Sequence, residues 1–188
     1  MKRKYRVFIA INLPEDVKKE LVGYQKKWSD LPARWVSRDN LHITLVFLGY
    51  LTDVELGEVC MIVKEVAQKY NSFDINLNKV IYGPVGKNPP RMIWVEVERL
   101  KELSFLKKDL EGELLNPIGF RPEARTFNLH ITLARIKLLE FRSINPEERP
   151  EVNEDLNLNF SVESIEVMES QLKRPGTVYT IMESFSLK

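Results

Sequence analysis

Apolar side chains recur along the chain with two spacings, and the spacing changes from one segment to the next. Alternating or continuous runs rich in β-branched and aromatic residues predict strands, and recurrence at every third or fourth position predicts helices. The predicted strands cover residues 5–13, 34–37, 41–49, 73–81, 91–98, 127–138, 158–170 and 176–187. The predicted helices cover residues 14–28, 53–70 and 100–115, with a short helix and a loop within 143–157. Strands therefore alternate with helices, which predicts an α+β protein.

The second half of the chain repeats the theme of the first half. The pentapeptide LHITL occupies residues 41–45 and again residues 129–133, and the only two histidines, His42 and His130, lie inside the two copies. Each half also contains a helix that could cover its own sheet, and no Ser- or Gly-rich linker separates the halves. We therefore expect one domain, residues 1–188, built from two pseudo-symmetric lobes.

Charge and composition narrow the classes of protein. Lys and Arg number 28 and Asp and Glu number 27, so the net charge is +1 and bulk binding of duplex nucleic acid is disfavoured. A local basic pocket for a nucleotide or an RNA end is compatible with this balance. The lysine- and glutamate-rich segments 18–27 and 107–115 are typical of solvated helix faces. No stretch reaches the roughly 20 apolar residues of a membrane span, and nothing at the start resembles a signal peptide, so we expect a cytoplasmic protein.

The repeated motif places polar groups on one face of each strand. Successive side chains of a strand point to opposite faces, so His42 and Thr44 share a face, as do His130 and Thr132. The leucines and isoleucines of the motif point the other way and suit a core. A histidine and a hydroxyl are costly to bury without partners, but they fit the wall of a cleft. Two such strands related by approximate twofold symmetry would place two His–Thr pairs across one groove.

That constellation fits acid–base chemistry at a single phosphorus atom. One imidazole can take a proton from the attacking oxygen while the other gives a proton to the leaving oxygen. The hydroxyls of Thr44 and Thr132 can hold the non-bridging oxygens, where charge gathers in the transition state. The residues alone do not say which histidine is the acid. Two histidines without a carboxylate or cysteine motif leave a zinc site short of ligands, and GxSxG, GxxxxGK[ST] and GxGxxG do not occur.

A structural origin of the repeat is the alternative. Duplication can copy a packing solution, and threonine is a natural strand residue. Copied packing would nevertheless favour apolar identity, whereas here the polar pair is retained as well.

With these residues in view, the chain resembles the two-histidine (2H) phosphoesterases, whose hallmark is a repeated H-x-[ST]-hydrophobic motif. Within that superfamily it is similar to the RNA 2′,3′-cyclic phosphodiesterases, also known as 2′-5′ RNA ligase-like proteins. The similarity covers nearly the whole length and includes RVFIAINLP, LHITLVFLG, RMIWVEV, LHITLARI and the tail SQLKRPGTVYTIMESFSL, with Ser170, Gly176 and Tyr179. One departure is Leu129, because many relatives have proline before the second histidine.

The resemblance implies a bilobal α+β fold in which two antiparallel sheets face a central cleft and the helices lie outside. It implies hydrolysis of a terminal ribose 2′,3′-cyclic phosphate to a 2′-phosphate without a metal or other cofactor. On this mapping His42 is the general acid that protonates the departing O3′. His130 is the general base, or it positions the water and the phosphate, and Thr44 and Thr132 bind the phosphate oxygens.

The same resemblance implies that Phe47 and Arg135 contact the terminal base. A base held between a ring and a guanidinium plane needs no hydrogen-bond readout, so base preference should be modest. Phe47 could equally belong to the core. Arg91 and Tyr179 are further candidates for lining the groove.

The expected partners are RNA ends or nucleotides that carry a 2′,3′-cyclic phosphate, including tRNA fragments, and we expect a monomer with no membrane association. Two other functions stay open at this stage. A 2′-5′ RNA ligase would run the same chemistry in reverse, with a ribose hydroxyl in place of water. A non-catalytic RNA-binding module would use the sheet surface alone, although such modules present aromatic motifs rather than twin His–Thr pairs.

Overall fold

The computed structural model describes residues 3–122, 128–174 and 176–188. The strands are β1 (Tyr5–Asn12), β2 (Ala33–Trp35), β3 (His42–Leu51), β4 (Phe73–Gly83), β5 (Met92–Val97), β6 (His130–Ile136), β7 (Asn153–Val162), β8 (Ser164–Lys173) and β9 (Gly176–Ser186). The α-helices are α1 (Glu15–Lys27), α2 (Asp53–Ala67), α3 (Lys101–Leu114) and α4 (Leu138–Ser143). Of the helices in these residues, none is both long enough and apolar enough to cross a membrane.

The strands form one antiparallel sheet in the order β7-β4-β5-β6-β3-β1-β8-β9, and β2 pairs with β6 outside that path. The two middle strands, β3 and β6, carry the two copies of the motif and are paired at a single position, Ile43↔Ile131. The α+β class is confirmed. The two expected sheets are the two halves of this sheet, joined through that one pair, with four strands of the path on each side of it.

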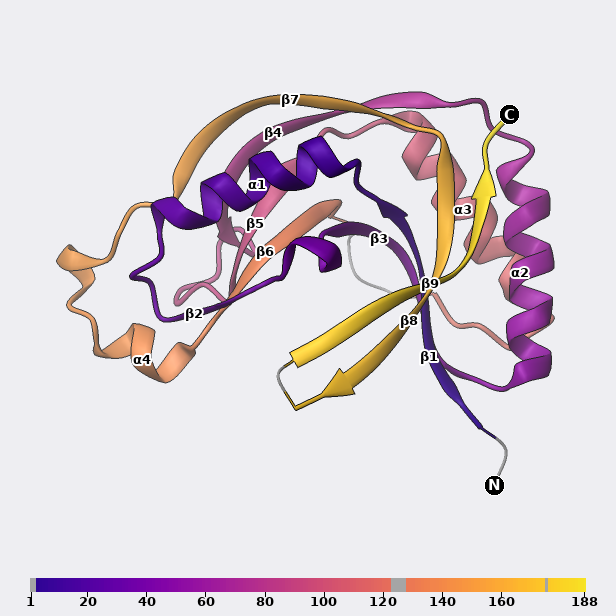
Figure 1. Cartoon of the computed structure of the whole chain (residues 1–188), viewed down its shortest axis with the longest axis horizontal. Helices are drawn as coiled ribbons and strands as arrows, with labels where there is room; N and C mark the ends of the chain where they lie inside the picture. Colours follow the sequence, from indigo (N-terminus) through magenta and orange to yellow (C-terminus); the bar gives the residue numbers. More distant parts are fainter. Residues whose placement is uncertain (1–2, 123–127, 175) are drawn as a thin grey trace.

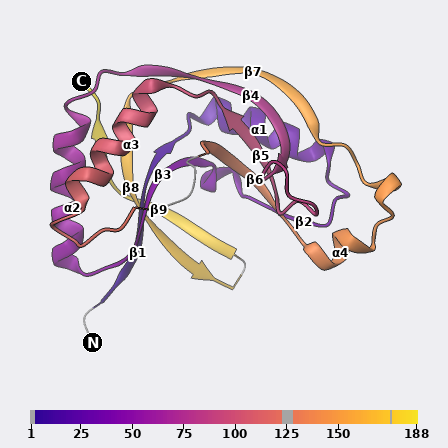
Figure 2. The same ribbon diagram turned by 180° about the vertical axis from the view of Figure 1, so that it is seen from behind.

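The helices connect the two halves rather than covering each half separately. Helix α1 follows β1, yet it packs against β6 and β7 of the other half. Helix α3 follows β5, and it packs against α2 and β3, again in the other half. Figures 1 and 2 show the same exchange, with α1 over the β4–β5–β6 side and α2 and α3 together at the opposite end. The expectation that each helix covers its own half is therefore wrong for α1 and α3.

One hydrophobic core runs through both halves, because the apolar faces of β3 and β6 both contribute to it. Ile43 and Ile131 are fully buried at its centre. The order of buried, half-buried and exposed residues is the same along both strands for the six residues that begin at each histidine. The two copies of the motif therefore share their burial pattern as well as their residues.

The start of α2 is fixed by a reciprocal pair of hydrogen bonds. Thr52 is the N-cap, and its hydroxyl accepts from the Glu55 backbone N–H at 3.4 Å. The Glu55 carboxylate in turn accepts from the Thr52 backbone N–H at 2.7 Å. This capping box satisfies donors that the first turn of a helix otherwise leaves without partners.

The prediction fails most clearly between residues 138 and 170. The short helix α4 begins at Leu138, inside the predicted strand 127–138, whose first residue lies outside the described part of the chain. The predicted loop contains the start of β7, and the predicted strand 158–170 is two strands that break at Glu163. Strand β7 is an edge strand, so its polar residues face water and resemble a loop. No glycine or proline marks the crossing from β7 to β8.

Candidate active site

The two motifs meet across a local twofold axis. Antiparallel pairing relates two strands by such an axis, and the pair Ile43↔Ile131 places it between the motifs. The same register sets His42 toward Thr132 and Thr44 toward His130. All four side chains are half-buried, whereas the intervening isoleucines are fully buried. The predicted faces are therefore correct, and the two histidines come together from positions 88 residues apart.

A one-residue irregularity lies at the last residue of each motif. The pairing of β3 with β1 skips Leu45, and the pairing of β6 with β5 skips Leu133. Such a bulge reverses the alternation of side chains beyond it. Phe47 and Arg135, five residues after the histidines, would otherwise point to the opposite face. The bulge brings both to the histidine face, and Phe47 is 58 % exposed there rather than in the core.

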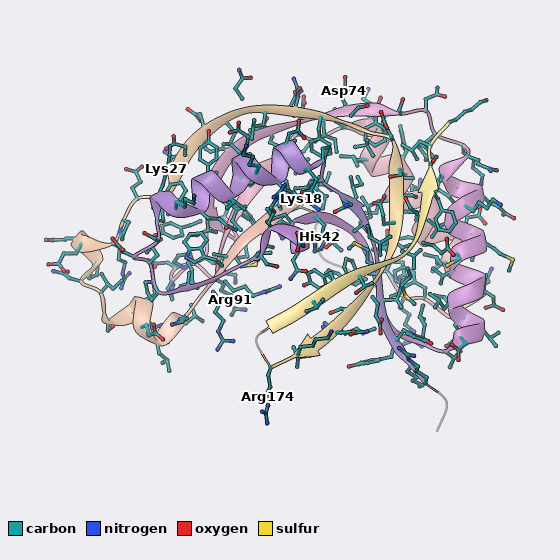
Figure 3. The ribbon with its side chains drawn as sticks, in the orientation of Figure 1. Lys18, Lys27, His42, Asp74, Arg91 and Arg174 are labelled. Carbon is teal, nitrogen blue, oxygen red and sulfur yellow. The ribbon has the colours of Figure 1, made fainter. Side chains whose placement is uncertain are left out.

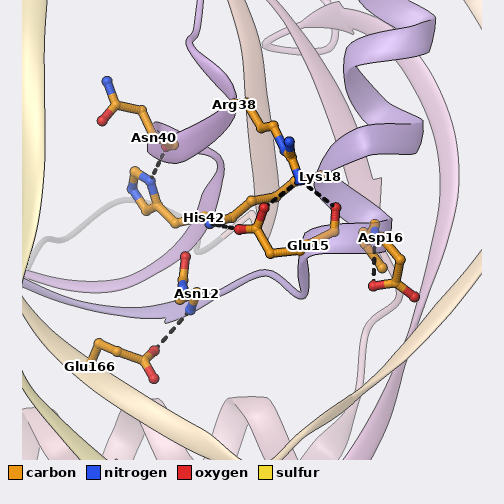
Figure 4. Close-up of polar contacts among 9 residues, drawn as sticks. Asn12, Glu15, Asp16, Lys18, Arg38, Asn40, His42 and Glu166 are labelled. Atoms are coloured by element: carbon orange, nitrogen blue, oxygen red, sulfur yellow. Dashed lines mark hydrogen bonds and ion pairs between the residues drawn. The ribbon is translucent and has the colours of Figure 1, made fainter.

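Each imidazole is held through Nδ1 by a backbone carbonyl two residues earlier. His42 Nδ1 lies 2.7 Å from the Asn40 carbonyl oxygen, and His130 Nδ1 lies 2.8 Å from that of Asn128. Figure 4 shows the first of these bonds. Because a carbonyl oxygen only accepts, Nδ1 carries the proton in the neutral ring and Nε2 keeps its lone pair. This orientation leaves Nε2 of both rings outside these bonds to the backbone.

The asparagines extend the repeat by one letter, because the shared segment is NLHITL at 40–45 and at 128–133. This asparagine lies just outside the predicted pentapeptide, and it is visible in the sequence one residue before each copy. The side chain of Asn40 also forms hydrogen bonds, with the backbone of β9. Its Nδ2 donates to the Thr177 carbonyl at 2.7 Å, and its Oδ1 accepts from the Tyr179 N–H at 3.1 Å. Asn40 thus ties β9 to the strand that carries His42.

The two halves differ at the threonines. The Thr44 hydroxyl lies 2.9 Å from His42 Nε2 and donates to it. Within the described residues, no corresponding bond joins Thr132 to His130. Only one of the two His–Thr pairs is therefore internally bonded in the free protein.

Aromatic rings border both imidazoles, and two of these rings, Phe8 and Trp94, are not among the predicted site residues. Phe8 of β1 lies 5.0 Å from His42 between ring centroids, and Trp94 of β5 lies 4.4 Å from His130. Strands β1 and β5 flank β3 and β6 at equivalent positions, so the two contacts are related by the twofold axis. Tyr179, one of the predicted candidates, meets His42 edge-on at 5.0 Å. The rings limit contact of both imidazoles with water.

This burial lowers the pKa of both histidines below the ordinary value near 6.5. For His42 the positive charges of His130, Lys18 and Arg135 lower the pKa further, while the bond to Asn40 raises it. For His130 the charge of Arg135 acts in the same direction as burial, and the bond to Asn128 opposes it. Both rings are therefore mainly neutral at pH 7 before an anion binds.

Lys18 is an unexpected neighbour of this site. Its side chain is only 5 % exposed, although the segment that contains it is typical of a solvated helix face. Its ammonium pairs with Glu15 at 3.3 Å, and Arg38 binds the same carboxylate at 2.5 Å. Figure 4 shows this group beside His42. The solvated-face prediction is wrong at this residue because α1 lies against the other half of the sheet.

A hollow of about 560 Å³ opens on the groove face next to His42. Its lining residues are Arg6, Val7, Phe8, His42, Phe47, Gly49, Arg135, Ser170, Thr177 and Tyr179. The hollow thus brings His42, Phe47 and Arg135 together, whereas Thr44, His130 and Thr132 do not line it. In the described part of the chain, no group of three or more His, Cys, Asp and Glu side chains could hold a metal ion.

Comparison with known proteins agrees with the duplicated geometry. The model of the family described as LigT like Phosphoesterase matches the chain twice, at residues 11–94 and 96–179, and each match contains one motif. The chain belongs to this family. The RNA 2′,3′-cyclic phosphodiesterase of Methanothermobacter thermautotrophicus is 31 % identical over 98 % of this chain and 100 % of that protein. The protein of the same name from Aquifex aeolicus is 32 % identical over 97 % of each chain.

Solved structures show the same fold as this LigT-like phosphoesterase. The crystal structure of TT0787 of Thermus thermophilus has a TM-score of 0.83, with 30 % identity and 97 % of each chain covered. The structure of E. coli LigT complexed with 3′-AMP has a TM-score of 0.80 over 99 % of each chain. At 23 % identity, the second comparison supports the fold alone.

A substitution at Gly83 tests the packing of Trp94 against His130 in this phosphoesterase. A Cβ atom at Gly83 would lie 2.4 Å from Trp94 Cδ2, so the indole must move away from its place against His130. We expect Gly83→Ala to lower the free energy of unfolding by about 1–3 kcal/mol, as overpacking does, and to lower phosphoesterase activity. Chemical denaturation and turnover assays measure the two effects.

Gly57→Ala is the matched control, because Gly57 lies within α2 with no atom within 4 Å of its added Cβ. It should raise the free energy of unfolding by about 0.5–1 kcal/mol and leave activity unchanged. If Gly83→Ala kept both its stability and its turnover, the proposed support of His130 by Trp94 would be wrong.

Asn40 offers a second test, in which the two motifs should respond differently. Asn40→Ala removes both side-chain bonds to β9 but keeps the carbonyl that accepts from His42. We expect the free energy of unfolding to fall by about 1–3 kcal/mol and kcat/KM to fall as Tyr179 loosens from His42. Asn128→Ala is the paired variant, since within the described residues its side chain makes no hydrogen bond. Equal losses in the two variants would contradict this role of the Asn40 amide.

Proposed function

We propose that this protein is a phosphodiesterase that hydrolyses ribose 2′,3′-cyclic phosphate, at an RNA end or on a nucleotide, to the 2′-phosphate. The observation that carries the proposal is the pairing Ile43↔Ile131, which sets two NLHITL strands side by side with both imidazoles held through Nδ1. The family and the name of the relatives from Methanothermobacter and Aquifex support the same reaction.

In the proposed reaction, a water oxygen forms a bond to phosphorus while the bond from phosphorus to O3′ breaks. His130 Nε2 takes the proton of the attacking water, and protonated His42 gives its Nε2 proton to O3′. The product carries a 2′-phosphate and a free 3′-hydroxyl. The threonine hydroxyls bind the non-bridging oxygens, and the Thr44 hydroxyl can turn to the phosphate once Nε2 of His42 is protonated.

The bound phosphate itself makes the acid available. Both imidazoles have lowered pKa values in the free protein, so neither is a ready proton donor at pH 7. An anion between the two rings favours the charged form of either ring. Substrate binding thus raises the pKa of the histidine that must supply a proton.

In the proposed complex the terminal base lies between Phe47 and Arg135. Both residues line the hollow at His42, and Phe47 is exposed enough to offer its ring face. Stacking of this kind accepts any base, so we infer modest base preference. The partners we propose are RNA ends and nucleotides with a 2′,3′-cyclic phosphate, including tRNA fragments. A monomeric state and a cytoplasmic location stay predictions.

The decisive assay uses a nucleoside 2′,3′-cyclic phosphate with EDTA present. We expect the wild-type protein to retain its activity in EDTA. His42→Ala and His130→Ala should each lower turnover by about 10²–10⁴-fold, because general acid–base catalysis contributes that much. Product analysis by ³¹P NMR distinguishes the 2′-phosphate from the 3′-phosphate.

A p-nitrophenyl phosphodiester of a nucleoside separates the two roles, because its leaving group needs little protonation. It should restore turnover to His42→Ala and not to His130→Ala. Full activity of either folded histidine variant on the cyclic substrate would refute the mechanism, and restoration of His130→Ala alone would exchange the roles.

The pH dependence follows from the direction of the pKa shifts. Catalysis needs one imidazole neutral and the other protonated, and kcat/KM reports the free protein. Because both pKa values lie below about 6.5, we expect the kcat/KM optimum below that pH and the kcat optimum at a higher pH. Initial rates from pH 4.5 to 9 test this, and a kcat/KM optimum above neutral pH would contradict it.

The same shifts predict an effect on stability. The unfolded chain binds protons at these imidazoles more readily than the folded protein does, so stability falls as the pH decreases through about 6.5. Thermal unfolding at pH 5 and pH 7.5, compared with the double histidine-to-alanine variant, isolates the contribution of the two rings.

A further inference from the structure

A pair of arginines with like charge lies at one end of the groove. Arg34 of β2 is directly opposite Arg135 of β6 in the antiparallel pairing. Side chains of directly opposed residues project from the same face, and the bulge at Leu133 has already placed Arg135 on the histidine face. Arg34 therefore shares the groove face with the catalytic candidates. Like charges in directly opposed positions destabilise a sheet, so a pair of this kind suggests a function that offsets the cost in stability.

Neither guanidinium is neutralised within the described residues. No carboxylate there lies within ion-pair distance of Arg34 or Arg135, and the one polar contact of Arg135 is with Met92 Sδ at 4.0 Å. The nearby carboxylate of Glu140 is already paired with Lys137 at 3.1 Å. Two positive charges thus stand uncompensated on a protein whose net charge is only +1.

These charges border a second hollow of about 440 Å³, lined by Arg34, Arg135, Ile136, Lys137, Leu138, Leu139 and Glu140. Arg135 lines both this hollow and the hollow at His42, so the two hollows adjoin at this residue. Leu139 is 82 % exposed and adds apolar surface beside the charges. Arg91 is a further cation at this end, since its carbonyl accepts from the Ile136 N–H at 2.9 Å; Figure 3 shows its side chain projecting outward.

We propose that this second hollow is a binding site for the phosphodiester of the nucleotide that precedes the cyclic-phosphate end, with Arg34 as its phosphate ligand. The inference rests on the proposed function, because it assumes that the terminal nucleotide occupies the hollow at His42. A guanidinium matches a phosphate with two parallel hydrogen bonds, and the exposed leucines can receive the adjoining nucleoside. An RNA strand is then a better substrate than a free nucleotide.

The test compares two substrates, a nucleoside 2′,3′-cyclic phosphate without a 5′-phosphate and a trinucleotide that ends in the same group. Arg34→Gln should lower kcat/KM for the trinucleotide by roughly tenfold, the typical value of one charge-assisted hydrogen bond. The loss should appear in KM with kcat unchanged, because the contact is equally strong in the ground state and the transition state. The nucleoside substrate should change by less than about twofold.

Salt dependence supplies a second readout. Removing one phosphate contact to a single strand should lower the slope of log kcat/KM against log salt concentration by about 0.7 for the trinucleotide. Lys64→Gln is the control, since it removes the same charge from the exposed surface of α2, away from both hollows. Its slope should equal that of the wild-type protein.

Thermal unfolding of the free protein shows whether Arg34→Gln lowers activity by destabilising the fold. Arg34→Gln relieves the repulsion from Arg135, so its Tm should equal or exceed that of the wild-type protein. A lower Tm together with losses on both substrates would overturn the proposal and make Arg34 a structural partner.

Two other outcomes separate this inference from the proposed function. Equal kcat/KM of Arg34→Gln and wild type on the trinucleotide, with normal hydrolysis of the nucleoside substrate, refutes the second site alone. Wild-type protein that hydrolyses neither substrate refutes the phosphodiesterase proposal and, with it, the site that depends on it.

Discussion

The whole arrangement depends on one antiparallel contact between two strands. Ile43 and Ile131 pair at the centre of the sheet, and both are fully buried in a core that the two halves share. The contact places the twofold axis, and the axis places each histidine next to the other motif. A substitution that separated these isoleucines would separate the two imidazoles as well, because nothing else pairs β3 with β6 in the described chain.

Around that contact, the protein keeps its imidazoles in an environment that disfavours charge. Phe8 and Trp94 cover the rings from equivalent strands, and backbone carbonyls fix both rings in the same tautomer. Low polarity strengthens the interaction of the rings with a bound anion. The symmetry is not complete, since only the first motif has a threonine bonded to its histidine. The two histidines are related by the twofold axis but differ in their hydrogen bonds, and this difference allows them to take different catalytic roles.

Much of the site follows from strand periodicity, and the rest depends on departures from it. An alternation of two correctly places His42 and His130 with their threonines on one face. The same alternation places Phe47 and Arg135 on the wrong face, and only the bulges at Leu45 and Leu133 correct it. Two consecutive buried positions, Leu45–Val46 and Leu133–Ala134, mark those bulges in the structure. In the sequence they look like ordinary apolar runs.

Local patterns in the sequence do not determine how distant segments pack against one another. The alternation of helices and strands predicts the α+β class but not which helix covers which strands. Lys18 looks solvent-exposed on a helical wheel, and it is buried because α1 crosses to the other half. Strand β7 resembles a loop in the sequence because it is an edge strand and its solvent-facing residues are polar.

The exchange of α1 and α3 between the halves has a consequence for the minimum size of the molecule. A polypeptide with only the first motif would keep α2 but would lack α3, which packs against α2 and β3, and its α1 would lack β6 and β7. A fragment of this kind could restore those contacts only by associating with a copy of the other part of the chain, and its folding would then depend on concentration. Joining both copies in one chain makes that association intramolecular.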